Sequence, residues 1–164
     1  AFTPTDLNYT IQQALDLVHY QLQNAAINVI QTLADDLPRI TVSAEHMKSV
    51  WLNLLVNARD AVLTRPENRQ IEITTRLDPE ADHVQILFRD NGKGMSEAEA
   101  AHIFEPFYTT KDPGQGTGLG LATCHRIIEQ HGGEIHALSE TDGGVTFFIR
   151  LPINPINEER GDYE

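Results

Sequence analysis

A glycine-bearing turn at the end of an apolar strand constrains this chain more than any other feature. Residues 83–88 (HVQILF) alternate in character and end apolar, a pattern that predicts a half-buried or fully buried strand. The strand delivers the carboxylate of Asp90 into a turn that Gly92 and Gly94 keep open, because glycine adopts positive φ and lets another group approach closely. An ionised carboxylate only accepts hydrogen bonds, so it suits an exocyclic amine. Taken alone, the segment also fits an ordinary β-turn.

Two further segments favour a nucleotide site over an ordinary turn. Residues 114–122 (GQGTGLGLA) are glycine-rich and open onto a helical pattern, and the free N–H groups of a helix N-terminus attract phosphate. Upstream, Asn53 and Asn57 lie one turn apart on a predicted helix and therefore share a face. An amine acceptor, a phosphate cradle and paired amide oxygens together predict a nucleotide-binding site.

The remaining pattern predicts one α+β domain over residues 1–156, followed by an acidic tail over 157–164 that we expect to fray. We expect a two-layer α/β sandwich, with a mixed, mainly antiparallel sheet and helices on one face, because the elements do not alternate as regular βαβ units. Helical spacing predicts helices over about 8–22, 43–64 and 118–130, with a short one from Ser96. Alternation predicts strands over 27–33, 70–77, 83–88, 134–140 and 145–151.

Composition narrows the classes of function. A formal net charge of −12 argues against nucleic-acid binding. The single cysteine, Cys124, excludes an internal disulfide and a cysteine metal cluster, and it is most simply a small core residue. No apolar run approaches the roughly 20 residues that a membrane helix needs. We therefore expect a cytoplasmic domain that makes no membrane contact, although a longer parent protein can carry an anchor.

Four motifs then occur in an order that resembles the ATP-binding catalytic domain of sensor histidine kinases. They are residues 53–58 (NLLVNA), 90–95 (DNGKGM), 103–107 (IFEPF) and 116–121 (GTGLGL), the N, G1, F and G2 boxes of that family. The resemblance covers nearly the whole chain. It implies the Bergerat ATP-binding fold, which DNA gyrase, mismatch-repair ATPases and heat-shock chaperones share.

The same resemblance implies an enzyme and its partners. The chain would bind Mg·ATP and donate the γ-phosphate to a histidine on a separate dimerisation and phospho-acceptor helical hairpin of the same parent protein. This is the chemistry of two-component signal transduction, in which a response regulator is an indirect partner.

The resemblance also implies roles for single residues. Asp90 would take the adenine amino group, Gly94 would pack close to the base, Asn57 would bind Mg²⁺ through its side-chain oxygen, and Asn53 would lie near the phosphates. Phe104 and Phe107 would anchor a lid formed by residues 108–116, and Thr146 would support Asp90. The further nucleotide contacts implied are Gly92, Met95, Tyr108, Gly116, Thr117, Gly118, Leu119, Gly120 and Leu121.

Two departures from the family pattern leave the phosphate-binding cation open. Asp60 and Ala61 stand where many members carry Lys and Tyr, and Thr109 to Lys111 follow Tyr108 where many carry an Arg. Both variants resemble the nitrogen-regulation-type branch of sensor kinases. Lys111 is the candidate for the γ-phosphate, because a point charge on a flexible stem can reach it; an ordinary solvated loop lysine is the alternative.

Two other functions stay open on the sequence. Hydrolases of the gyrase and chaperone type carry a Glu at the position of Asn53, and an asparagine cannot act as the base that activates water. The other possibility is a non-catalytic binding module in which ATP serves only as a conformational switch.

His19 lacks the sequence surround of a phospho-acceptor, and His125 and His131 lack zinc-ligand spacing, so we expect structural roles for all three.

Overall fold

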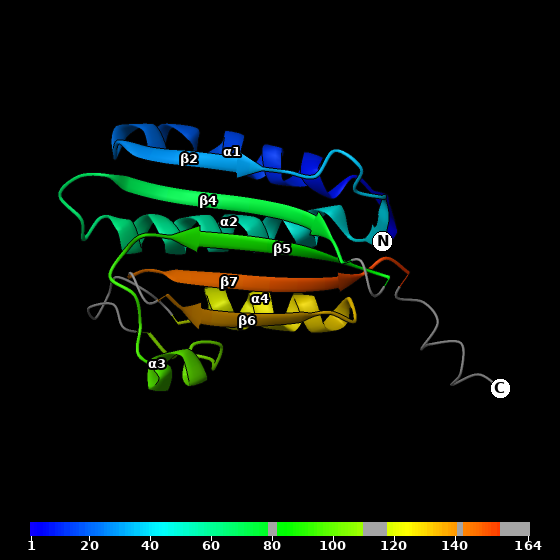
Figure 1. The fold of residues 1–164 in the computed structure, drawn as a ribbon. Helices are drawn as coiled ribbons and strands as arrows, with labels where there is room; N and C mark the ends of the chain where they lie inside the picture. Colours follow the sequence, from blue (N-terminus) through cyan, green and yellow to red (C-terminus); the bar gives the residue numbers. More distant parts are fainter. Residues whose placement is uncertain (79–81, 110–117, 141–142, 155–164) are drawn as a thin grey trace.

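Helices α1 (Leu7–Asn24), α2 (Ala44–Val62) and α4 (Gly120–Gln130) cover one face of a five-stranded sheet (Figure 1). The computed structural model describes residues 1–78, 82–109, 118–140 and 143–154. The sheet contains, in spatial order, β2 (Ile27–Thr32), β4 (Arg69–Leu77), β5 (His83–Asp90), β7 (Val145–Pro152) and β6 (Glu134–Ser139). Strand β2 is parallel to β4, and the other neighbouring pairs are antiparallel. The predicted α+β sandwich with a mixed sheet is confirmed.

Two smaller elements lie outside this sandwich. Strands β1 (Thr3–Thr5) and β3 (Ile40–Val42) form a separate antiparallel pair that the sequence pattern did not reveal. The short helix α3 (Glu97–His102) follows the turn after β5, as Ser96 predicted. None of the helices in the described ranges is both long and apolar enough to cross a membrane.

Side chains placed just before α1, α2 and α3 explain where these three helices begin. The carboxylate of Asp6 accepts a hydrogen bond from the Tyr9 N–H at 3.2 Å, and the hydroxyl of Ser43 accepts one from the His46 N–H at 3.3 Å. Ser96 forms a reciprocal capping box with Glu99. These bonds satisfy backbone donors that have no partner inside a helix.

The core joins helices α1 and α2 to the middle of the sheet. Trp51 of α2 stacks on Phe88 of β5, with ring centroids 5.5 Å apart, and donates its indole N–H to the Thr10 hydroxyl of α1 at 2.9 Å. Alternate residues of β5 point inward, and the last residue on this buried side is Asp90. The strand that fills the core with apolar side chains therefore ends on the same side with a carboxylate.

His131 ties the start of α2 to the end of α4. Its ring is 1% exposed, its Nδ1–H donates to the Ile127 carbonyl at 2.8 Å, and its Nε2 accepts from the Ser43 N–H at 3.1 Å. Phe2 stacks on it at 4.3 Å. This pattern needs a neutral imidazole, and burial lowers the pKa of His131 below its ordinary value of 6.5.

The lowered pKa of His131 predicts acid sensitivity. Above pH 6.5 the imidazole is neutral in both states; as pH falls below 6.5 the unfolded chain takes up the proton first, so the free energy of unfolding decreases. His131→Gln offers a donor and an acceptor but does not titrate, so its unfolding free energy should change less between pH 7.5 and pH 5. Urea titrations across this range provide the measurement, with the exposed His19→Gln as the control. Equal pH slopes in wild type and His131→Gln would contradict the assignment.

Candidate functional site

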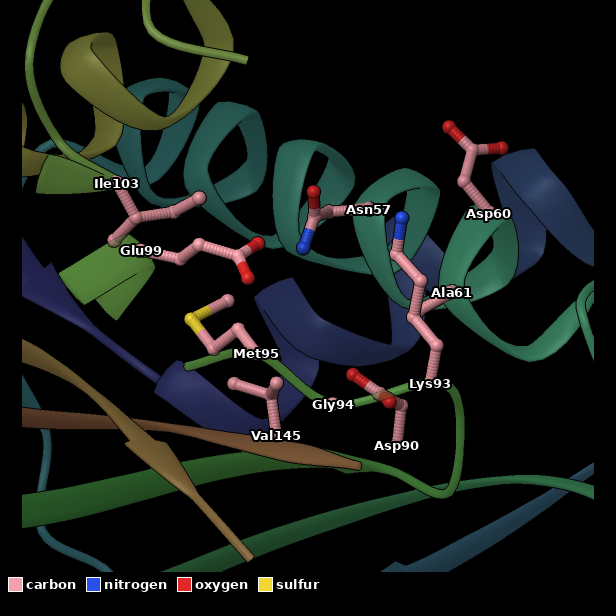
Figure 2. A pocket seen from close by; sticks show the side chains of 10 residues that line it. All are labelled: Asn57, Asp60, Ala61, Asp90, Lys93, Gly94, Met95, Glu99, Ile103 and Val145. Carbon is pink, nitrogen blue, oxygen red and sulfur yellow. The ribbon is translucent and has the colours of Figure 1, made fainter. Parts of the chain in front are cut away.

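The turn after β5 brings Asp90 to a pocket between α2 and the sheet (Figure 2). Asn57 projects from α2 on the opposite side of this pocket, and α3 borders it through Glu99. The full set of lining residues is Asn57, Asp60, Ala61, Asp90, Lys93, Gly94, Met95, Glu99, Ile103 and Val145. The N box and the G1 box, which lie more than thirty positions apart in the sequence, therefore face one cavity.

Burial gives the Asp90 carboxylate its distinctive chemistry. The residue is 2% exposed, and its Oδ1 accepts the Gly92 N–H at 2.8 Å. Burial raises the pKa of Asp90 to about 6, although backbone hydrogen bonds from Gly92 and Val145 act in the opposite direction. At neutral pH the group is an ionised, poorly solvated acceptor. A ligand N–H group that donates a hydrogen bond to Asp90 would compensate for the poor solvation of this carboxylate.

Asn91 holds the turn in place, a role that sequence reasoning missed. Its Oδ1 accepts the Gln70 N–H at 2.9 Å, and its Nδ2 donates to the Asn68 carbonyl at 2.6 Å. Its own backbone N–H donates to the Gln70 carbonyl at 3.2 Å. The residue next to Asp90 is thus fixed to the first residues of β4. The one sequence feature that could have predicted this role is the residue type, because asparagine side chains often hydrogen-bond to backbone groups in turns.

The glycines of the turn serve two different purposes. Gly94 has φ +76°, the left-handed conformation that favours glycine. Gly92 does not; instead, a Cβ there would lie 2.5 Å from the Ala61 backbone, so this glycine lets the turn pack directly against α2. The group that approaches Gly92 closely is therefore the protein's own helix.

The sheet register corrects the expectation for Thr146. Strands β5 and β7 pair Asp90 with Val145 and Arg89 with Thr146. Because successive side chains of a strand point to opposite faces, Val145 shares the pocket side with Asp90, and it lines the cavity. Thr146 faces the other way and donates its hydroxyl to Glu140 at 2.5 Å. The prediction that Thr146 supports Asp90 is wrong by one residue.

The F box and the start of α4 meet beside the pocket. Phe104 stacks on His125 at 5.5 Å and lies edge-on to Phe147, whereas Phe107 is 74% exposed. Phe107 has φ +67° and donates its N–H to the Gly118 carbonyl at 2.9 Å. A Cβ on Gly118 would fall 2.4 Å from the Phe107 carbonyl carbon. These contacts join the two ends of the segment between Phe107 and Gly118.

Asn53 connects α2 to the first turn of α4. A Cβ on Gly120 would lie 3.0 Å from the Asn53 Oδ1, and the Asn53 Nδ2 donates to the Ser49 carbonyl at 3.1 Å. The N-cap residue of α4 is Leu119, which supplies no side-chain cap, and Leu121 packs against the core. Cys124 on the same helix is fully buried, and burial raises the pKa of its thiol to about 12, in agreement with a core role.

The structure brings together only part of the predicted site. Asn57, Asp90, Gly94 and Met95 line the pocket, with Gly92 in its turn. Tyr108 lies against His102, with ring centroids 6.0 Å apart. Lys111, Gly116, Thr117 and most of the predicted lid lie outside the described residues.

The structure is a two-layer sandwich in which the buried Asp90 carboxylate faces Asn57 of α2 across one pocket, and comparison with known proteins places this arrangement among ATPases. Residues 42–155 match the family described as histidine kinase-, DNA gyrase B- and HSP90-like ATPases, and the chain belongs to this family.

Two curated proteins with similar sequences are named as kinases. Sporulation kinase E of Bacillus subtilis (strain 168) is 38% identical over 155 residues, which cover 94% of this chain and 20% of that protein. Sensor histidine kinase ZraS of Escherichia coli (strain K12) is 37% identical over 154 residues, covering 94% and 32%. The chain thus spans between a fifth and a third of the length of these two relatives.

Solved structures agree with this assignment. The catalytic domain of histidine kinase ThkA superposes with a TM-score of 0.83 at 32% identity, covering 94% of this chain and 97% of that one. ThkA in complex with the response regulator protein TrrA superposes with a TM-score of 0.80 at 28% identity, covering 95% and 43%. The predicted resemblance to histidine kinase catalytic domains is confirmed.

Gly144 offers a test of the close packing around Asp90. A Cβ there would lie 2.0 Å from the Asp90 carbonyl oxygen, whereas a Cβ on the adjacent Gly143 meets nothing closer than 3.7 Å. Both glycines have positive φ. Gly143→Ala should cost about 1–2 kcal/mol of stability from φ strain alone, and Gly144→Ala about 3 kcal/mol or more. Denaturant unfolding measures both variants, and equal losses would refute the contact.

Proposed function

We propose that this chain is the catalytic domain of a sensor histidine kinase, which binds Mg·ATP and donates the γ-phosphate to a histidine on a separate helical hairpin of its parent protein. In this proposal, residues 1–156 form the domain and 157–164 an appended tail. The observation that carries the proposal is the buried Asp90 carboxylate, which faces Asn57 across one pocket. The complex of ThkA with TrrA supports a response regulator as the downstream partner.

Asp90 recognises adenine in this proposal. The carboxylate accepts the Gly92 N–H through Oδ1 and also accepts a backbone hydrogen bond from Val145, and because an ionised carboxylate has about four acceptor sites it can accept the exocyclic amine as well. Gly94 and Met95 line the same cavity and would pack beside the base, where Gly94 presents no side chain. An amine in this position also relieves the poor solvation of the carboxylate.

The phosphates and the metal would lie toward α2 and α4. Asn57 lines the pocket, and its side-chain amide carries an oxygen, which is a hard donor of the kind that Mg²⁺ accepts alongside waters and phosphate oxygens. When bound, the ion supplies charge neutralisation for phosphoryl transfer. The backbone N–H groups after Gly118, in Leu119, Gly120 and Leu121, would bind phosphate at the N-terminus of α4.

Residues of the lid complete the proposed site. Gly116 and Thr117 would extend the phosphate cradle, and Tyr108 and Phe104 would hold the lid at its first end. Lys111 would meet the γ-phosphate, because a lysine carries a point charge on a flexible stem. Transfer would then depend on positioning and charge stabilisation and not on covalent chemistry of the domain.

Asn53 favours transfer over hydrolysis. An amide has no basic lone pair at neutral pH, so it cannot take a proton from an attacking water. Its Nδ2 is hydrogen-bonded to the Ser49 carbonyl, which turns its Oδ1 toward Gly120. Asn53 therefore positions the start of α4, where phosphates would bind. It provides no general base that could activate a water for hydrolysis.

Replacement of Asp90 tests the adenine contact. In Asp90→Asn, the amide N–H would oppose either the Gly92 N–H or the adenine amine, since both are donors. Affinity for ATP and for ADP should fall alike, by about 1–3 kcal/mol, because the base is common to both. Calorimetry on Asp90→Asn, with the exposed Asp16→Asn as the matched control, measures this. Unchanged affinity in a folded Asp90→Asn protein would refute the contact.

Wild-type affinity should also depend on pH. Because burial raises the pKa of Asp90 to about 6, the acceptor form is lost as pH falls below that value, and ATP affinity should weaken between pH 7.5 and pH 5. Asp90→Asn should lack this component of the pH dependence.

Replacement of Asn57 tests phosphotransfer itself. Asn57→Asp keeps the size but sets a negative charge beside the triphosphate, so transfer should fall on the order of 100-fold. The measurement mixes the domain with labelled ATP and the parent protein's helical hairpin, and follows acid-labile phosphohistidine on the hairpin. The domain alone should label itself negligibly. Stoichiometric self-labelling, or normal transfer by Asn57→Asp, would contradict the proposed division of labour, and binding of ATP without any transfer would indicate a nucleotide-gated binding module.

A further inference from the structure

The pocket of Figure 2 carries more negative than positive charge. Among the residues that line it, Asp60, Asp90 and Glu99 are acidic and Lys93 alone is a permanent cation. The adjoining outer recess repeats this imbalance, because Glu99 and Glu140 line it together with Lys93. If the proposed function is right, a triphosphate enters an acidic cleft on a chain of net charge −12. A positive side chain in the described part of the cleft would then add to the charge that the metal and Lys111 supply, and would lower the electrostatic cost of this entry.

Lys93 is placed by the packing of its neighbour. Gly92 lies directly against the backbone of Ala61, so the next side chain along the turn starts at the surface of α2. Figure 2 shows the Lys93 stem running past Ala61 toward Asn57. A methyl group at position 61 leaves space for this path, which a large aromatic side chain would fill. The ammonium group is therefore carried from the Asp90 side of the pocket toward the Asn57 side.

The charges around Lys93 leave its ammonium group available. Asp60 is paired with Arg59, at 3.1 Å between Nη2 and Oδ1. The side chain of Glu99 accepts the Ser96 N–H in the capping box of α3. The ion pairs found among the described residues do not include Lys93. Lys93 is thus exposed and has no ion-pair partner in the part of the chain that the structure describes, beside a cleft that would have to accept anionic phosphates.

We propose that Lys93 binds the phosphate groups next to the ribose, the α- and β-phosphates of ATP. This inference rests on the proposed function and extends it. The base would lie at Asp90 and the metal at Asn57, so the ribose and the first phosphates must span the interval along which the Lys93 stem runs. Lysine suits this task, because its flexible stem presents three donors and a compact charge. Many family members carry Lys and Tyr where this chain has Asp60 and Ala61. Lys93 would thereby supply the positive charge that these two residues do not.

Graded ligands separate a phosphate contact from a structural effect. Lys93→Met keeps an apolar stem against Ala61 but removes the charge, and Lys93→Arg keeps the charge. Lys48→Met is the matched control, since it removes one positive charge from the same protein at an ion pair with Glu45 outside the pocket. Calorimetry would measure adenosine, AMP, ADP and ATP with each protein, with and without Mg²⁺, at several salt concentrations.

The expected result is specific to phosphate. Lys93→Met should bind ADP and ATP about five- to tenfold more weakly than wild type, the effect of one charge-assisted hydrogen bond at an exposed site, while its affinity for adenosine stays unchanged. Its ADP affinity should depend less steeply on salt. Lys93→Arg should bind ADP and ATP like wild type, and Lys48→Met should match wild type throughout.

Three results would overturn the inference, and they differ from a failure of the proposed function. Equal weakening of adenosine and ADP would give Lys93 a structural role only. Unchanged ADP and ATP binding, in a protein whose affinity still depends on Asp90, would leave the kinase proposal intact and remove Lys93 from the site. A loss confined to ATP would place Lys93 at the γ-phosphate instead. Absence of ATP binding by the wild-type protein would refute both proposals.

Discussion

Burial of the Asp90 carboxylate is the constraint on which this end of the molecule depends. An ionised group with little access to water is unfavourable unless neighbouring donors are fixed around it. Three segments provide that fixation: the turn through the Gly92 N–H, β7 through Val145, and β4 through the side chain of Asn91. Each contact requires close backbone packing, which explains the glycines at positions 92 and 144. An apolar side chain at this buried position would stabilise the fold more than a carboxylate does. The presence of a carboxylate therefore indicates a ligand-binding role.

Helix α2 joins this binding chemistry to the core. One side of the helix buries Trp51, Leu54 and Leu55 against the sheet and α1, while Asn53 and Asn57 project from another side toward α4 and the pocket. His131 fixes the N-terminus of the helix to the end of α4. The position of Asn57, the proposed metal ligand, is therefore set by packing interactions of α2 with the sheet, α1 and α4, and not by the pocket alone.

Local patterns predicted the fold and singled out several residues that line the pocket, because each pattern lies within a short stretch of sequence. Alternation located β5, spacing located α2, and the glycine-rich turn located Asp90 in the sequence. Tertiary facts escaped this reasoning. The family resemblance gave the supporting role to Thr146, whereas pairing with β5 puts Val145 on the face of Asp90, and a shift of one residue exchanges the faces of a strand. The purpose of Gly92 depends on Ala61, thirty-one positions away, and strands β1 and β3 are three residues each, too short to show a period.

The lone cysteine has a practical consequence for studying nucleotide-linked motion. Cys124 is fully buried in α4, and its thiol stays protonated because its pKa is raised to about 12. Maleimide and nitroxide reagents react with exposed thiolates, so the native chain should remain unlabelled under mild conditions. A cysteine introduced at an exposed position such as Leu138 or Phe107 would then be the single reactive thiol. Site-directed fluorescence and spin-label spectroscopy can therefore use this sequence without first replacing Cys124.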